Sequence, residues 1–242
     1  MIINILGNTT WGITLAKVLS NDKNQVNLVF IDEKKLIKTS SESSIKVDRF
    51  EIPRSKNINY IFIDEMNLNK EDTLIIAVPS PRLIDNLNLI KNKVNNTTQI
   101  ISASKGFDKD GNTLSVLIKN KLKIPEENIG VLSGPNLSSE ILMNKPATSL
   151  LSFKDIKKAN YFRDNISNEI FRIYSGSDVI GSEIGGSLKN IIAIGCGIID
   201  KMQLGDNAKS AFISRGLREI VRFGTSFKAK EYTFYGLSGI GD

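Results

Sequence analysis

The spacing of apolar residues along the chain predicts an α/β fold. Ile2–Leu6 is a short apolar run, and residues 11–19 then carry apolar side chains at the spacing of one helix face. Thr73–Val78 is apolar almost throughout, which is typical of a strand buried on both faces of a parallel sheet. The same alternation predicts strands at Gln25–Ile31, Gln99–Ala103, Ile129–Leu132 and Ser149–Phe153, and helices from Pro81 to about Lys93, at Leu114–Leu122 and at Leu137–Met143.

The pattern changes in two places. Residues 33–60 are polar and serine-rich around Ser40–Ser44, so we expect an irregular excursion between strands there. After Tyr174 the spacing becomes helical, with Ser182 placed to cap a long helix and a second apolar stripe beginning at Asn207. We therefore predict a doubly wound α/β domain over residues 1–180 and an all-α second domain over residues 181–242. Only about two helices fit into the second part, so we expect that domain to be incomplete.

The composition narrows the chemistry that the chain can perform. Its 242 residues include no histidine and one cysteine, Cys196. Without imidazole there is no Ser-His-Asp or Cys-His machinery and no histidine-ligated metal, so we expect no metal site and assign proton transfer to Lys, Asp, Glu or Tyr. A single thiol forms no intrachain disulfide, which fits a reducing compartment.

Charge and hydropathy exclude two further classes of protein. The 32 Lys and Arg residues exceed the 26 Asp and Glu residues by six, but the positive charges are dispersed along the chain. Nucleic-acid binders gather such charge on one face with stacking aromatic residues, so we expect no nucleic-acid partner. The longest uncharged apolar stretch, Asn190–Ile199, is shorter than the ~18 residues of a membrane span, so none is expected. The basic surplus suits a phosphorylated metabolite or a dinucleotide.

The turn after the first predicted strand is a candidate phosphate site. Gly7-Asn8-Thr9-Thr10-Trp11-Gly12 joins a strand to a helix, where backbone N–H groups and a helix N-terminus face a pyrophosphate. Thr9 stands where dinucleotide-binding proteins of the Rossmann type carry a middle glycine. We predict that Gly7, Thr10, Trp11 and Gly12 bind the cofactor; a tight turn in a nucleotide-free α/β protein is the alternative.

Asp32 lies at the end of the second predicted strand, 20 residues beyond Gly12. A carboxylate at this place hydrogen-bonds the adenosine ribose hydroxyls in NAD sites and disfavours a 2′-phosphate. Lys34 and Lys35 lie close enough to neutralise such a phosphate, and an aspartate at a strand end also forms turns. The cofactor is therefore predicted as NAD or NADP, with NAD favoured.

Later segments carry a resemblance to a known family. These are Lys105-Gly106-Phe107, Ser133-Gly134-Pro135-Asn136, Glu183-Ile184-Gly185-Gly186-Ser187-Leu188-Lys189-Asn190 and Gly236-Leu237-Ser238-Gly239-Ile240-Gly241-Asp242. Together, in this order, they resemble the bacterial type of NAD(P)-dependent glycerol-3-phosphate dehydrogenase, and the similarity covers nearly the whole chain. The resemblance implies a Rossmann-type domain and reversible hydride transfer between NAD(P)H and dihydroxyacetone phosphate, giving sn-glycerol 3-phosphate for phospholipid synthesis in the cytoplasm.

Matched positions carry roles over from that family. The resemblance implies that Lys189 is the catalytic lysine, that Asn190 lies at the reacting centre and that Asp242 orders the lysine and the substrate. It further implies that Lys105 contacts both cofactor and substrate, and that Gly134 and Asn136 contact the substrate. Ser138 matches a cofactor contact.

Some features depart from the family pattern. Asn136 and Ser138 stand where bacterial members usually carry a hydroxyl residue and alanine, and the Ser-Arg-Asn segment that should follow Asp242 and hold the substrate phosphate is absent. A non-catalytic dinucleotide-binding remnant is therefore the alternative to an active oxidoreductase. A dehydrogenase acting on a small hydroxy or keto acid would not account for Lys105, Lys189 and Asp242 together. An incomplete helical bundle would expose apolar surface, through which a homodimer could form.

Four glycines lie in the segment predicted as a long helix. Each costs a helix interior ~1 kcal/mol relative to alanine, so close approach by another helix or by a ligand is expected at each of them, with helix packing favoured. These residues are Gly185, Gly186, Gly195 and Gly197.

Overall fold

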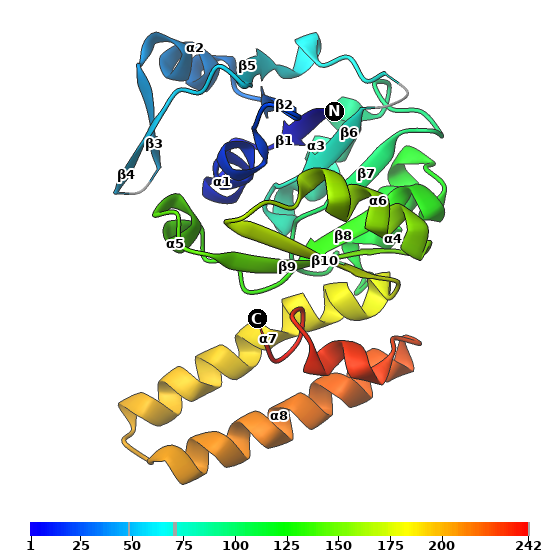
Figure 1. Cartoon of the computed structure of the whole chain (residues 1–242). Helices are drawn as coiled ribbons and strands as arrows, with labels where there is room; N and C mark the ends of the chain where they lie inside the picture. Colours follow the sequence, from blue (N-terminus) through cyan, green and yellow to red (C-terminus); the bar gives the residue numbers. More distant parts are fainter. Residues whose placement is uncertain (48, 70–71, 242) are drawn as a thin grey trace.

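The computed structural model describes residues 1–47, 49–69 and 72–241. The described chain forms an α/β domain followed by a long helical hairpin (Figure 1). The hairpin lies against one end of the α/β domain, and the last described residues fold back onto it (Figure 1). None of the described helices combines the length and the apolar character needed to cross a bilayer.

A mixed sheet forms the centre of the α/β domain. Among the described residues it has eight strands in the order β10-β9-β8-β7-β6-β1-β2-β5. The neighbours from β5 to β8 pair in parallel, whereas β9 runs antiparallel to β8 and parallel to β10. The strands are β1 (Ile2–Leu6), β2 (Gln25–Phe30), β5 (Ile58–Phe62), β6 (Thr73–Ile76), β7 (Gln99–Ser102), β8 (Ile129–Ser133), β9 (Ala147–Phe153) and β10 (Phe171–Gly176).

Helices cover both faces of the sheet, as the doubly wound prediction requires. The core on one face joins α1, α5 and α6 to the sheet, and the core on the other face joins α3 and α4 to it. The helices are α1 (Thr10–Leu19), α3 (Leu83–Ile90), α4 (Leu114–Leu122), α5 (Ser138–Leu142) and α6 (Ile156–Ile166). Strand β1 contributes to both cores, because Ile3 and Ile5 face one layer and Leu6 faces the other. This two-sided burial explains the continuous apolar runs of the central strands.

The prediction of an irregular excursion over residues 33–60 is wrong. This stretch contains α2 (Glu33–Ser41), the antiparallel hairpin β3 (Ser44–Val47) with β4 (Phe50–Pro53), and β5 at the edge of the main sheet. Helix α2 buries none of its residues, so its sequence shows no apolar stripe. Strand β5 pairs in register with β2, and the side-chain amide of Asn59 donates to Asn27, which in turn donates to Asn4 on β1, each at 2.9 Å. This polar ladder conceals the strand pattern.

The helical hairpin consists of α7 (Val179–Lys201) and α8 (Asp206–Ser226). The predicted cap at Ser182 is wrong: Asp178 caps α7 by accepting a hydrogen bond from the amide of Gly181 at 3.0 Å. Ser182 is buried one turn further on, where its hydroxyl lies 2.8 Å from that of Ser152 on β9. The predicted boundary at residue 180 stays a prediction; the first residue of α7 is Val179.

The glycines of α7 are confirmed as close-packing positions with one exception. A Cβ atom at Gly185 would collide with the carbonyl oxygen of Ser238, and one at Gly195 would collide with the ring of Phe212. A Cβ atom at Gly186 would collide with the hydroxyl of Ser133. The expectation is wrong for Gly197, which has nothing within 4 Å of the added atom.

Alanine substitutions at Gly185 and Gly197 should therefore act in opposite directions. Gly185→Ala meets a backbone carbonyl that cannot swing away, so we expect it to lower the free energy of unfolding by ~1–3 kcal/mol. Gly197→Ala enters open space and should raise it by ~1 kcal/mol through helix propensity. Urea denaturation of the two variants beside the wild type measures both changes, and effects of the same sign would contradict the packing described here.

Candidate active site

A pocket of about 340 Å³ lies beyond the carboxyl ends of β1, β6, β7 and β8. The order of the strands from β5 to β8 corresponds to 3-2-1-4-5-6, and the chain changes direction across the sheet between β1 and β6. Ligands of open α/β sheets bind at this switch point. The lining brings together five residues that the sequence singled out, Thr9, Trp11, Lys105, Asn136 and Ser138, with Ala77, Val78, Pro79, Ser80, Ala103, Ser104 and Leu132.

The glycine turn lies against the end of β6. Gly7 has φ of +120°, and a Cβ atom there would lie 2.7 Å from the carbonyl oxygen of Ala77. Gly12 closes the other end of the turn, where an added Cβ atom would overlap the carbonyl oxygen of Gly7. The hydroxyl of Thr9 donates to the Ala77 carbonyl at 2.8 Å and accepts from the amide of Gly12 at 3.0 Å. Thr9 thus caps α1 and fastens the turn to β6, a role that a middle glycine could not perform.

The start of α1 suits a dinucleotide. Thr10 and Trp11 occupy its first turn, where backbone N–H groups have no acceptor within the helix and attract phosphate. Trp11 also lines the pocket, and its ring makes an edge contact with Phe171 at 6.4 Å between centroids. Asn136 belongs to the pocket lining, and its amide oxygen is buried with no hydrogen-bond donor among the described residues. These features fit NAD or NADP.

Asp32 lies at the end of β2 and begins α2. Its carboxylate accepts from the amides of Lys34 and Lys35 at 3.0 and 3.3 Å. The residue is therefore a helix cap in this structure, whereas the alternative that the sequence left open beside ribose binding was a turn former. Contact with a ribose stays a prediction.

Lys105 follows β7 at the edge of the pocket. Its ammonium group donates to the carbonyl of Gly134 at 3.3 Å. Gly134 has φ of +150°, and the backbone of residues 148 and 149 leaves no room for a side chain there. Asn136 is held nearby, since its amide nitrogen donates to the Ser149 hydroxyl at 2.6 Å. Lys105, Gly134 and Asn136, which the sequence proposed as substrate contacts, thus share one region of the structure.

Lys189 and Asn190 lie on α7, which passes close to this region. The site of an added Cβ atom at Gly186 is 3.7 Å from Cε of Lys105, and Lys189 follows Gly186 by three residues on the same helix face. The amide of Gly106 donates to the Ser187 hydroxyl at 2.8 Å, which fixes α7 against the loop that carries Lys105. Lys189 is half-buried and Asn190 is exposed. Asp242, the third predicted catalytic residue, lies outside the described residues.

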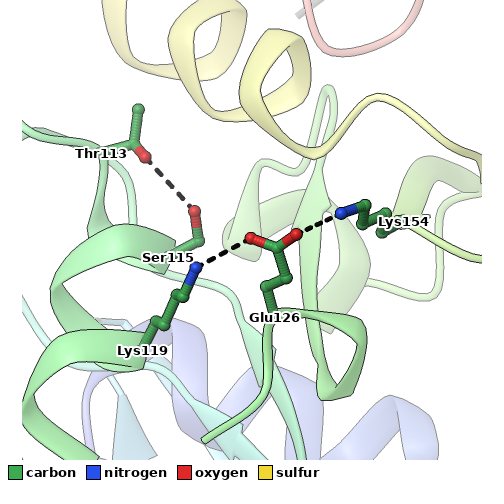
Figure 2. A network of polar contacts seen from close by, with 5 residues as sticks. All are labelled: Thr113, Ser115, Lys119, Glu126 and Lys154. Carbon is green, nitrogen blue, oxygen red and sulfur yellow. Dashed lines mark hydrogen bonds and ion pairs between the residues drawn. The ribbon is translucent and has the colours of Figure 1, made fainter. Parts of the chain in front are cut away.

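The sequence analysis gave no role to Glu183, a fully buried carboxylate on α7. It accepts hydrogen bonds from both the amide and the hydroxyl of Ser115 at the start of α4, the amide at 2.8 Å. Figure 2 shows the Ser115 hydroxyl directed towards that of Thr113, 3.3 Å away. A charged side chain within the otherwise apolar and small segment of residues 180–188 was the signal that could have revealed it.

A second polar cluster lies at the surface beside α4. Glu126 accepts from Lys119 at 2.9 Å and from Lys154, which follows β9 (Figure 2). The two ammonium groups lower the pKa of Glu126 to about 2. All three side chains are largely exposed, so solvent screening makes this cluster a minor contribution to stability.

The sheet order and the glycine turn at its switch point define a dinucleotide-binding protein of the Rossmann type. The helical hairpin that follows this domain carries Lys189 on α7. Comparison with known proteins identifies the family.

Residues 2–159 match the family model for the N-terminus of NAD-dependent glycerol-3-phosphate dehydrogenase, and residues 178–242 match the model for its C-terminus. The chain belongs to this family of NAD(P)-dependent dehydrogenases. A glycerol-3-phosphate dehydrogenase [NAD(P)+] of Oceanobacillus iheyensis is 34% identical over 99% of this chain and 70% of its own length. Another, of Dehalococcoides mccartyi strain CBDB1, is 38% identical over 98% of this chain and 67% of its own.

Solved structures agree with the fold. The crystal structure of glycerol-3-phosphate dehydrogenase from Coxiella burnetii superposes with a TM-score of 0.86 at 29% identity, covering 100% of this chain and 74% of that one. The enzyme from Plasmodium falciparum gives a TM-score of 0.86 at 28% identity and is covered over 71% of its length. D-mandelate dehydrogenase, at 14% identity and a TM-score of 0.64, shares the fold alone.

The buried Glu183 should make stability depend on pH. Burial raises the pKa of this carboxyl to about 7 from an ordinary 4.5, and the hydrogen bonds from Ser115 only partly oppose the rise. Because the folded-state pKa is above the unfolded one, the stability contributed by the protonated group is complete below pH 4.5 and is lost as the pH rises through about 7. Glu183→Gln cannot ionise and should escape this loss.

Urea denaturation across this pH range tests the expectation. The free energy of unfolding of Glu183→Gln should exceed that of the wild type by a margin that grows from pH 4.5 to 7 and then stays constant. Glu169→Gln, at an exposed position, is the control and should follow the wild-type profile. Parallel curves for wild type and Glu183→Gln would show that the buried carboxyl ionises as it does in the unfolded chain.

Proposed function

We propose that this protein catalyses reversible hydride transfer between NAD(P)H and dihydroxyacetone phosphate, forming sn-glycerol 3-phosphate for glycerophospholipid synthesis in the cytoplasm. The observation that carries the proposal is the approach of two lysine-bearing segments at the dinucleotide pocket: Lys105 lines it, and α7 passes Lys105 one turn before Lys189. The names of the relatives supply the substrate class.

The reaction needs a donor to the substrate oxygen. Bound NAD(P)H supplies the hydride to the carbonyl carbon. Negative charge then develops on the carbonyl oxygen, and a cation directed at that oxygen stabilises it and delivers the proton. In a chain without histidine, the Lys189 ammonium group is suited to both tasks. The product alcohol thus gains one hydride at carbon and one proton at oxygen.

The remaining residues hold the substrate. Lys105 offers a second positive charge to the phosphorylated ketone, and Asn136 offers amide groups beside the Gly134 carbonyl. Asp242 would balance the charge of the two lysines and orient Lys189. Two neighbouring cations also favour an anionic substrate over a neutral one.

Removal of the Lys189 side chain tests the proposal. Purified protein is mixed with dihydroxyacetone phosphate and NADH or NADPH, and the loss of reduced-cofactor absorbance gives the rate. We expect Lys189→Ala to lower kcat by ~10²–10⁴-fold, since it removes the proton donor, while the dissociation constant of NADH stays nearly unchanged. Lys201→Ala, an exposed lysine at the end of the same helix, is the matched control and should retain wild-type kcat.

Two outcomes would contradict it. Wild-type protein that binds NADH but does not consume it would favour the non-catalytic remnant. Full turnover by Lys189→Ala would refute the role of this lysine while leaving the reaction itself in place.

Cofactor preference should depend on Asp32. A carboxylate at the end of β2 repels a 2′-phosphate, so we expect NADH to bind more tightly than NADPH. Asp32→Asn should bring the ratio of the two dissociation constants closer to one. Asparagine caps a helix as well as aspartate does, so the substitution removes charge without removing the cap. Asp155→Asn is the control, because Asp155 caps α6 through the amide of Lys157 in the same way. Fluorescence titration with both cofactors gives the ratios, and an unchanged ratio in Asp32→Asn would exclude Asp32 from the site.

A further inference from the structure

We propose that Glu183 is a positioning residue that sets the separation of Lys105 and Lys189 by joining α7 to the start of α4. The inference rests on the proposed function for the importance of these two lysines. Glu183 is buried and lies on the α4 side of α7, outside the residues that line the dinucleotide pocket.

Glu183 contacts the start of α4. Thr113 is the N-cap residue of α4, but its side chain makes no capping hydrogen bond. The Glu183 carboxylate takes over this task from another helix: one oxygen accepts from the Ser115 amide at 2.8 Å and the other from the Ser115 hydroxyl. The start of α4 is therefore tied to α7 by two bonds to one residue.

The loop between β7 and α4 connects the start of α4 to Lys105. Thr113 forms an antiparallel β-bridge with Phe107, which closes the loop between β7 and α4. Within that loop, the amide of Asp108 donates to the carbonyl of Asn112 at 2.9 Å. Lys105 is two residues from the bridged Phe107. A displacement of the start of α4 therefore moves the backbone that carries Lys105.

Helix α7 connects Glu183 to Lys189. Ser187 lies four residues after Glu183 on the same helix face and accepts from the amide of Gly106 at 2.8 Å. Lys189 follows two residues later, in the same uninterrupted helix. Glu183 and Ser187 thus fix the rotation and height of α7 at two points, the start of α4 and the loop between β7 and α4. Lys105 lies on the loop side of these contacts, next to Gly106, and Lys189 lies on the helix side, two residues after Ser187.

The length and chemistry of the side chain both matter. An apolar residue at this position would leave the buried Ser115 amide without its acceptor. Aspartate would keep the charge but draw the oxygens back by one methylene, so α7 or α4 would have to shift to restore the bonds. Glutamine keeps the length: its amide oxygen can accept from the Ser115 amide, and its nitrogen can donate to the Ser115 hydroxyl.

Three variants separate positioning from general support. Misplacement of reacting groups by ~1 Å costs up to ~100-fold in rate, so we expect Glu183→Asp and Glu183→Ala to lower kcat by ~10–100-fold with the NADH dissociation constant within ~2-fold of wild type. Glu183→Gln should retain more than about a third of kcat, because the spacing is preserved. Ser182→Ala is the matched control, since it removes the contact between Ser182 and Ser152 that joins α7 to β9 without involving Lys105. It should leave kcat unchanged.

A readout that is independent of turnover completes the test. Hydrogen exchange followed by mass spectrometry should show faster exchange in the peptide covering residues 104–116 for Glu183→Asp and Glu183→Ala, and wild-type exchange there for Ser182→Ala. Wild-type kcat in Glu183→Asp, or an equal loss of kcat in Ser182→Ala, would overturn the proposal. If the wild type itself shows no turnover, the proposed function fails, and the exchange result alone decides: equal exchange in all variants overturns the role of Glu183.

Discussion

The closeness of α7 to the carboxyl ends of β7 and β8 is the constraint on which the site depends. Gly186 permits this approach, because any larger side chain would collide with Ser133, and Gly185 permits the chain near Ser238 to pack against the same turn of the helix. The next residue, Ser187, is also small, and its hydroxyl accepts a hydrogen bond from the amide of Gly106. Small residues at the closest contact are what allow a helix of the second region to pass Lys105 at the edge of a pocket built by the first.

Polar contacts fix this arrangement, and one of them is costly. Glu183 is buried at a site where its charged form is disfavoured, which the raised pKa of its carboxyl reflects. A carboxylate in such a place is weak evidence for stability but gives a direction and a length to the contact. The hydroxyl pair of Ser152 and Ser182 is a separate contact, which joins α7 to β9. Apolar packing alone, as in the small core around Ile184 and Phe234, would permit more sliding of the helix.

The sequence predicted the central strands and the glycine turn because the physical signals there are local. Strands such as β6 are buried on both faces and therefore apolar throughout, and the turn at Gly7 needs a positive φ that glycine adopts readily. The stretch over residues 33–60 failed because an exposed helix and an asparagine ladder carry no apolar period. Asp178 rather than Ser182 caps α7 since Lys230 and Thr233, distant in sequence, also donate to its carboxylate.

By itself, the sequence determined the central strands and the glycine turn, the absence of histidine chemistry and the residue types available for the site. These depend on local periodicity and on composition, which a linear chain displays. Only the tertiary structure decided that Thr9 fastens the turn to β6, that Asp32 caps a helix and that Glu183 joins two helices 68 residues apart in sequence. Such contacts depend on which backbone groups meet after the sheet has assembled, and neighbours in sequence do not encode that directly.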